Sequence, residues 1–298
     1  MLIKTDTLLG WRSKANCTRA KTFVVLRKDT LFNYISFDKY GRRVSEENVV
    51  NNDSLAKVFT NRKHAIFLGD SYTFGHGLIY NSTFPYIFES LHPEYKSYNY
   101  GLTGYGPHQF CFLFDKRINR INNISVPEDS GFCMYTYIDE HLDRVWGGNQ
   151  YLKFGFSSPD VYIINDSLVL KKRSELKNAF AWFINHSETF EFFNINIEHP
   201  KKTSFYKRFA DIINYTAALY WNLKPTGQFY IGLYPDKFTI KDTTWIKFLN
   251  HKIKVIRIPV PKDYDLKKSS YLIPDGHPSK KLNDYYSKYF SKYIKNSK

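Results

Sequence analysis

A glycine-bounded turn placed directly after a short apolar run is the feature of this sequence that most constrains its fold. The apolar run covers residues 64–68 and the turn covers residues 69–75, with the sequence GDSYTFG. Apolar residues at near-helical spacing follow from Phe84 to Leu91. This pattern predicts a buried strand, a tight turn with Ser71 at its apex, and then a helix.

Such a turn suits a nucleophilic serine. It lifts the Ser71 hydroxyl off the sheet edge, and the backbone N–H groups at the start of a helix face the place where an oxyanion would form. The alternative is an ordinary strand-to-helix turn, because Gly, Asp, Ser and Thr are common in turns and helix caps.

A second motif, Asp275-Gly276-His277-Pro278, lies just before the last predicted helix. A serine hydrolase needs a base within hydrogen-bond reach of the nucleophile and a carboxylate that orients the base. Asp275 and His277 are two positions apart on one turn, so a single loop could supply both. The alternative for this motif alone is a surface turn.

Together the two motifs resemble those of the GDSL/SGNH hydrolase superfamily, and the resemblance extends from about Lys63 to the last residue. It implies an α/β fold, a flavodoxin-like three-layer α/β/α sandwich, and the activity of a serine esterase, lipase, O-acyl esterase or O-acyltransferase. It also implies Ser71 as the nucleophile, His277 as the base and Asp275 as its orienting carboxylate. No cofactor is implied.

The second sequence block of that family is Asn-x-Gly-x-x-Gly, and residues 99–104 (NYGLTG) are similar to it. The resemblance implies that Gly104 donates its N–H to the oxyanion beside the N–H of Ser71. Without the other blocks, this stretch would be interpreted as a glycine-rich turn after a strand at about 95–100.

The third block departs from the family pattern. Where the family has Gly-x-Asn-Asp, with the asparagine as a third oxyanion donor, residues 139–144 read DEHLDR. An imidazole N–H can replace an amide N–H, so His141 is the candidate for this donor. Alternatively His141 caps the strand end or pairs with a neighbouring acid. The aspartate of the family also more often precedes the histidine by three positions than by two, which bears on Asp275.

Aromatic residues flank the first two blocks. Tyr72 and Tyr105 are candidate substrate-binding residues, because their rings could stack on a sugar or line an acyl pocket. The alternative is that both rings serve only in packing.

Further along the chain, predicted strands alternate with predicted helices, which favours a central parallel five-stranded sheet with right-handed crossovers. The carboxyl ends of parallel strands meet at one edge, so Ser71, Gly104, His141 and His277 are expected to converge there. The predicted strands are 64–68, 96–100, 132–138, 228–233 and 252–258, and the predicted helices are 84–91, 107–121, 174–186, 203–222, 243–250 and 279–295.

The predicted domain organisation has two parts. Residues 1–60 form a small β-rich N-terminal segment, with strands at 22–27 and 31–37, that packs on a catalytic domain covering residues 61–298. An insertion at about 149–200 interrupts that domain. It begins with a predicted hairpin whose strands, 151–156 and 161–170, flank a turn at 157–160.

The composition agrees with a globular protein: of 298 residues, 43% are hydrophobic and 18% aromatic. The sequence has no run of eighteen apolar residues, so it predicts no transmembrane helix. Its first residues lack the pattern of a signal peptide. We therefore expect a cytoplasmic protein if the sequence is whole, and a cell-envelope protein if an export or anchor segment has been removed. The three cysteines have no metal-like spacing.

The net charge of +15 favours anionic partners such as acidic glycans. Signatures of nucleic-acid binding, nucleotide binding and metal binding are missing from the sequence, so neither a nucleic-acid partner nor a metal or other cofactor is expected. The expected function is a serine ester hydrolase that acts on a carbohydrate-linked or small acyl ester. The alternatives are an O-acyltransferase acting on an envelope polysaccharide and a catalytically inactive glycan-binding module on the same fold.

Overall fold

The computed structural model of the chain describes most of its residues. These are residues 3–6, 8–25, 30–50, 61–115, 124–146, 159–172, 179, 183, 201–234, 242–264 and 270–295.

A sheet of eight strands forms the middle of the molecule, in the order β12-β11-β8-β6-β7-β5-β4-β3. Its first five strands run parallel to one another, which confirms the predicted parallel five-stranded sheet. They are β6 (Lys63–Leu68), β7 (Tyr95–Asn99), β8 (Gly131–Tyr137), β11 (Gln228–Leu233) and β12 (Lys254–Arg257).

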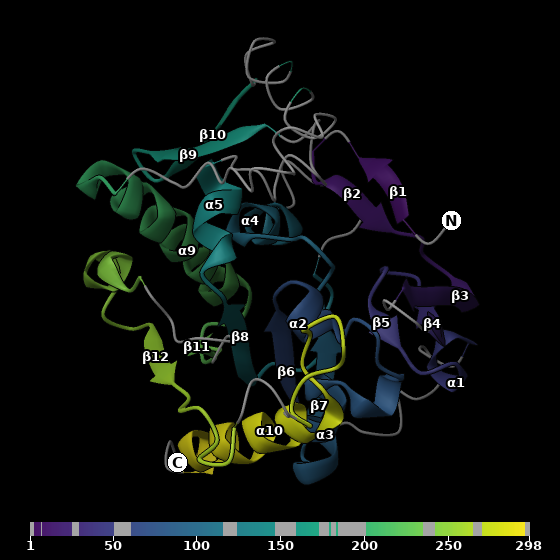
Figure 1. Cartoon of the computed structure of the whole chain (residues 1–298). Coiled ribbons are helices and arrows are strands. Elements are labelled where there is room, and N and C mark those ends of the chain that lie inside the picture. Colours follow the sequence, from purple (N-terminus) through teal and green to yellow (C-terminus); the bar gives the residue numbers. More distant parts are fainter. Residues whose placement is uncertain are drawn as a thin grey trace.

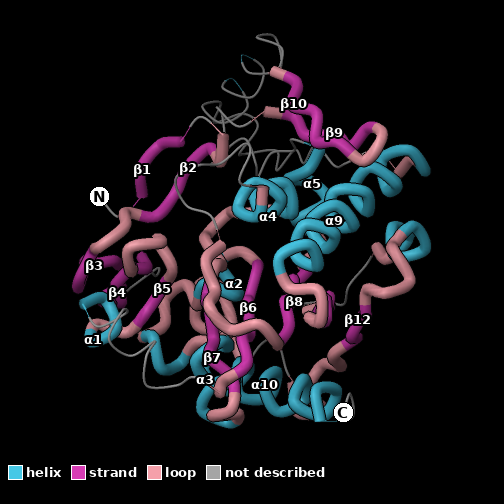
Figure 2. Tube along the Cα trace, turned by 180° about the vertical axis from the view of Figure 1, so that it is seen from behind, coloured by secondary structure: helices cyan, strands magenta, loops and turns pink. Residues whose placement is uncertain are grey.

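The other three strands come from the N-terminal segment and run antiparallel. They are β3 (Cys17–Val25), β4 (Thr30–Phe37) and β5 (Arg43–Val44). They join the sheet at its β7 edge, where Arg43 pairs with Asn99. The segment therefore continues the central sheet and does more than pack on it. Figure 2 shows these strands on the side of the parallel strands away from β12. A separate hairpin, β1 (Ile3–Asp6) and β2 (Gly10–Ser13), and a short helix, α1 (Glu47–Val50), complete the described part of this segment.

Helices cover both faces of the sheet, giving the three-layer α/β/α arrangement (Figure 1). One face carries α3 (Phe84–Leu91) and α10 (Lys280–Lys295), and the other carries α4 (Pro107–Phe114), α5 (Glu140–Trp146) and α9 (Thr203–Leu223). Side chains alternate between the faces along each strand. In β6, Ala65 and Phe67 join the core under α3 and α10, whereas Ile66 and Leu68 join the core under α4 and α9.

The insertion differs from the prediction. Its described hairpin pairs β9 (Asp160–Ile164) with β10 (Ser167–Lys171), so the predicted strand 161–170 is in fact two strands. The turn between these two strands lies at Asn165 and Asp166. Both residues have left-handed backbone angles, φ 48° and 55°, which Asn and Asp tolerate better than other residues with side chains. The start of the predicted turn at 157–160 lies outside the described residues. The predicted strand 151–156 lies outside the described residues, as does almost all of the predicted helix 174–186.

The remaining described elements are short. α2 (Ser71–Phe74) follows β6, and 3₁₀ helices cover Tyr80–Ser82 and Thr244–Phe248. Of the helices described, none combines the length and the apolar character needed to cross a membrane.

Candidate active site

Ser71 lies where β6 ends and α2 begins, as the sequence pattern predicts. Asp70 caps the helix, since its Oδ1 accepts a hydrogen bond of 3.1 Å from the backbone N–H of Tyr72. The helix ends after one turn because Gly75 adopts a left-handed conformation, φ 81°. The N–H groups of Gly75 and His76 both donate to the Ser71 carbonyl at 2.9 Å. The backbone around the serine is therefore held on both sides.

The block at residues 99–104 packs directly on this turn. The Asn99 side-chain amide donates to the Thr73 carbonyl at 3.1 Å, and the Leu102 N–H donates to the Gly69 carbonyl at 3.1 Å. Gly101 is required by this approach, because a Cβ there would lie 2.6 Å from the backbone nitrogen of Phe74. The structure thus brings the first and second sequence blocks together.

Gly104 lies in the same loop as Gly101, with a left-handed φ of 83°. Among the described residues, neither the Ser71 N–H nor the Gly104 N–H donates a hydrogen bond to a protein acceptor. Free backbone donors beside a serine are what an oxyanion hole requires.

His277 and Asp275 lie together on the loop before α10. The His277 Nδ1 is 3.0 Å from the Asp275 Oδ2, and the His277 backbone N–H donates to Asp275 Oδ1 at 3.0 Å. Burial alone would raise the pKa of Asp275, but its hydrogen bonds with His277 outweigh burial, so the pKa lies below its usual value. The carboxylate is therefore ionised and faces one ring nitrogen of the histidine.

This loop lies beside α2 (Figure 1). The His277 ring centroid is 5.6 Å from that of Tyr72 and 4.6 Å from that of His76. Tyr72 is the second residue of the helix that Ser71 begins, and His76 follows the glycine that ends it. Residues about two hundred positions apart in the sequence thus meet at the carboxyl ends of the parallel strands.

His141 is on α5, and it faces Asp70. Its ring is fully buried; Nδ1 is hydrogen-bonded to the Tyr135 hydroxyl at 2.6 Å, and Nε2 lies 3.6 Å from Asp70 Oδ2. Burial lowers the pKa of His141 to about 4, although the carboxylate of Asp70 acts in the opposite direction. This geometry favours pairing with a neighbouring acid, one of the alternatives that the sequence left open, over donation to an oxyanion.

Arg144, one turn further along α5, is a residue that the sequence pattern did not single out. Its guanidinium donates to Asp70 Oδ2 at 2.8 Å and to the Tyr105 carbonyl at 2.7 Å. Burial would raise the pKa of Asp70, but the charge of Arg144 and the contact with His141 hold it well below its usual range. Arg144 therefore ties the cap of the serine helix to the loop that contains Gly104.

The two tyrosines proposed for substrate binding have different surroundings. Tyr105 is buried, and its hydroxyl donates to the Trp11 carbonyl at 2.8 Å, while the Trp11 indole donates to the Thr103 carbonyl at 3.0 Å. These contacts fix the β1–β2 hairpin over the loop, which favours the packing alternative for Tyr105. Tyr72 is half-buried, and its ring contacts those of Tyr234 and His277.

Arg43, from β5, is a second residue that sequence reasoning missed. It is fully buried behind α2, where its guanidinium donates to the carbonyls of Phe74 at 2.7 Å, Gly75 at 2.6 Å and Leu78. Burial lowers its pKa to about 10. These carbonyls belong to the last residue of α2 and to the turn after it, so an N-terminal strand supports the turn that carries Ser71.

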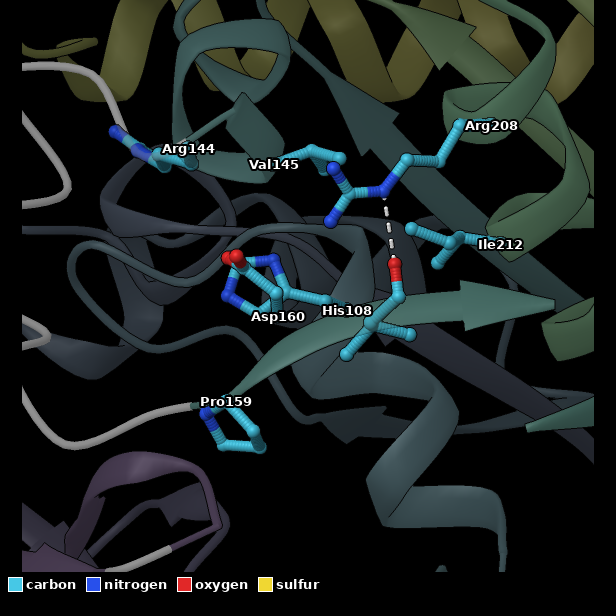
Figure 3. Close-up of a pocket in the computed structure, with 8 residues that line it drawn as sticks. His108, Arg144, Val145, Pro159, Asp160, Arg208 and Ile212 are labelled. Carbon is cyan, nitrogen blue, oxygen red and sulfur yellow. Dashed lines mark hydrogen bonds between the residues drawn. The ribbon is translucent and has the colours of Figure 1, made fainter. Parts of the chain in front are cut away.

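A shallow depression lies further away, between α4, α5, β9 and α9 (Figure 3). The Arg208 Nε donates to the Val161 carbonyl at 2.9 Å across it. Neither Ser71 nor His277 lines this depression. Of its lining residues, Arg144 also contacts Asp70 beside Ser71. We do not assign the substrate to this depression.

No family model and no curated protein matches the chain. Among solved structures, the chain is similar to an acetyl xylan esterase from the rumen bacterium Butyrivibrio proteoclasticus. The sequence identity is 11% and the TM-score 0.43, and the match covers 90% of this chain and 67% of that one.

Two further solved structures are similar. One is a carbohydrate esterase family 2 enzyme plus carbohydrate binding domain from Corynascus thermopiles (Myceliophthora fergusii), with 11% identity and a TM-score of 0.44, covering 78% of this chain and 65% of that one. The other is a member of the lipolytic protein G-D-S-L family from Veillonella parvula DSM 2008, with 15% identity and a TM-score of 0.37, covering 76% and 95%. The chain thus spans slightly less than two thirds of the family 2 enzyme. At this level of identity and overlap, the likeness assigns no residue and no activity to this chain.

Proposed function

We propose that this chain is a serine-dependent ester hydrolase of the GDSL/SGNH type, with Ser71 as nucleophile, His277 as base and Asp275 as the orienting carboxylate. The observation that carries the proposal is the Asp275–His277 pair, 3.0 Å apart, on a loop that lies against the helix begun by Ser71. A serine, a base and an acid are the parts that nucleophilic acyl transfer requires.

In the proposed reaction, Ser71 Oγ attacks the ester carbonyl while His277 accepts its proton on Nε2, because Nδ1 faces Asp275. The negative charge that develops on the carbonyl oxygen is stabilised by the N–H groups of Ser71 and Gly104. Each such donor contributes about 3–4 kcal/mol in the transition state. His277 then returns the proton to the leaving alcohol, and an acyl-enzyme remains.

Water completes the reaction. His277 removes a proton from the water as it attacks the acyl-enzyme, and the second tetrahedral intermediate releases the carboxylic acid and regenerates Ser71. His141 has no part in this scheme, since its ring faces Asp70 and Tyr135. The oxyanion hole of the proposal consists of backbone donors.

As substrate we propose a carbohydrate-linked or small acyl ester, with an anionic glycan favoured by the net charge of +15. Tyr72, half-buried beside His277, would contact the acyl group or a sugar ring. An O-acyltransferase would use the same residues with a sugar hydroxyl in place of water. An inactive glycan-binding module is less favoured, because glycan binding alone does not require an acid–base pair such as Asp275 and His277.

The test is fluorophosphonate labelling of the full chain, followed by a panel of acetyl and longer acyl esters of simple alcohols and sugars. We expect covalent labelling and ester hydrolysis by the natural sequence. Ser71→Ala should abolish both while the melting temperature stays within a few degrees, because the side chain is small and the backbone contacts remain. A Ser71→Ala variant that keeps most of its activity would refute the assignment.

A further inference from the structure

A second histidine stands beside the proposed acid–base pair. His76 Nε2 lies 3.8 Å from Asp275 Oδ2, and its ring centroid is 4.6 Å from that of His277. The three residues each offer a ligand atom, and these atoms all lie within 4.8 Å of one another. No step of the proposed reaction uses His76.

Two imidazole nitrogens and one carboxylate oxygen are a donor set that suits Zn²⁺. In a tetrahedral site with bonds of about 2 Å, neighbouring ligand atoms are roughly 3.3 Å apart. The separations found here are 3.0 Å between His277 Nδ1 and Asp275 Oδ2 and 3.8 Å between His76 Nε2 and the same oxygen. The third separation, between the two histidines, is within 4.8 Å. Ring rotations that shorten it by up to about 1.5 Å would bring the three atoms to a common ion, with water as the fourth ligand.

The three side chains are both held in place and open to solvent. His76 follows the left-handed Gly75, and its N–H donates to the Ser71 carbonyl at 2.9 Å. Asp275 accepts from the backbone of His277. The exposed fractions of the His76, Asp275 and His277 side chains are 29%, 18% and 23%. The His277 Nδ1 atom itself is covered, so the partly exposed ring has to turn before an ion can reach this ligand.

One nearby charge acts against a cation. Arg43 is close enough to act on the charged state of His76, although its guanidinium is already hydrogen-bonded to carbonyls behind α2. The carboxylate of Asp275 compensates for it at shorter range. This balance favours a reversible site over a permanently occupied one.

We propose that His76, Asp275 and His277 form an inhibitory zinc site, in which Zn²⁺ disables the catalytic base. Zn²⁺ bound to His277 Nδ1 takes the place of the proton there, and that proton moves to Nε2. The ring then has no free lone pair to accept the Ser71 proton, and Asp275 is occupied by the ion. The only bonds that change besides those to the ion are the two ring N–H bonds, and this proton shift is reversible, so a chelator restores the base. The proposed zinc binding does not depend on the proposed esterase function, whereas the proposed inhibition rests on it.

The experiment uses the full chain after treatment with a chelator. Zinc binding is measured by calorimetry, and esterase activity is measured with and without Zn²⁺, each variant being compared with its own zinc-free rate. We expect one Zn²⁺ per chain and loss of ester hydrolysis that a chelator reverses. Mg²⁺ at the same concentration should have neither effect, because it prefers oxygen ligands.

His76→Ala and His76→Gln remove one ligand and should weaken zinc binding and zinc inhibition at least about tenfold. Ser71→Ala, which keeps all three ligands, should bind zinc like the natural sequence. A thermal melt of each variant confirms that it is folded, and the second His76 variant replaces the first if the first is not.

The zinc site would be overturned if the natural sequence and both His76 variants bound zinc equally well. It would also be overturned if the natural sequence hydrolysed esters but neither bound Zn²⁺ nor was inhibited by it. Zinc binding that depends on His76 in a chain without esterase activity would support the site and refute the proposed function. The failures of the two proposals are thus distinguishable.

Discussion

At the scale of single residues, the proposed base and its carboxylate should contribute unequally to catalysis. His277→Ala should lose about as much kcat/KM as Ser71→Ala, because the members of a triad act as a unit. Asp275→Asn should lose roughly 10–100-fold less, because the carboxylate orients the imidazole and stabilises its charge without accepting the proton itself. The measurement is kcat/KM on an activated acetyl ester. An Asp275→Asn variant with full activity would remove Asp275 from the site.

His141 should matter for stability and little for chemistry. His141→Ala removes the partner of Tyr135 and one neighbour of the buried Asp70, which should lower the free energy of unfolding by about 1–3 kcal/mol. We expect kcat to fall less than about tenfold. If His141 were an oxyanion donor, its removal would instead lower kcat roughly 10²–10³-fold with little change in KM. Kinetics and a thermal melt on the same variant distinguish these outcomes.

Some residues of the candidate site can be proposed from the sequence alone. Ser71, Gly104 and His277 could be named because each belongs to a short motif that follows a predicted strand. Arg144 and Arg43 could not be found in this way. Their importance depends on which carboxylate or carbonyl lies opposite a buried guanidinium, and that is fixed only when distant elements pack. The charged run at 139–144 was the single available signal for Arg144.

At the scale of elements, β5 should determine how well the serine helix is held. Arg43→Met would remove the guanidinium donor from the carbonyls of Phe74, Gly75 and Leu78. The Gly75 carbonyl would keep the Leu78 N–H at 3.1 Å, and the Phe74 carbonyl only a 3.5 Å contact with the Asn99 amide. We expect a loss of about 2–4 kcal/mol in stability together with lower kcat/KM, because the turn that carries Ser71 loosens. Activity should be measured at a temperature at which the variant is still folded.

The neighbouring residue provides a matched control. Arg42 is also buried, but it pairs with Asp38 at 2.6 Å and donates to the Ser125 carbonyl, away from the serine turn. Arg42→Met should therefore lower stability without lowering the kcat/KM of the folded protein. Equal kinetic losses in the two variants would argue that Arg43 acts only through general stability.

Elements with a clear pattern were predicted closely, and the exceptions have a local cause. The apolar runs of the five parallel strands and the amphipathic final helix agree with the structure within a few residues. The hairpin turn at Asn165 and Asp166 was missed because Ser157-Ser158-Pro159-Asp160 is the stronger turn signal by composition. The joining of β5 to β7 could not be foreseen, since a pairing of two residues leaves no periodic pattern in the sequence.

At the scale of the whole molecule, the buried histidines make stability depend on pH. His64 contacts the Glu128 carbonyl and the Tyr220 hydroxyl, and burial lowers its pKa to about 4 from 6.5, although the Glu128 contact acts in the opposite direction. Above pH 6.5 neither the folded nor the unfolded state binds this proton. Below pH 6.5 the unfolded state binds it first, so stability falls until about pH 4, by up to about 3 kcal/mol.

Chemical denaturation at a series of pH values between 7 and 4 measures this effect. His141, whose pKa is also lowered to about 4, acts over the same range. His64→Gln should therefore make the decline shallower without removing it. A variant that declines as steeply as the natural sequence would show that His64 is not the group responsible.

Contacts between segments far apart in the sequence allow the fraction of correctly folded chains in a preparation to be measured. The Asn283 side chain donates to the Ser82 carbonyl across 201 positions of sequence, and α10 packs on α3 in the same core. The loop with His277, which leads into α10, is therefore in place beside α2 only when α10 has packed on α3. Covalent titration of Ser71 would then measure the fraction of chains that are completely folded, because partly folded chains would not react with the reagent.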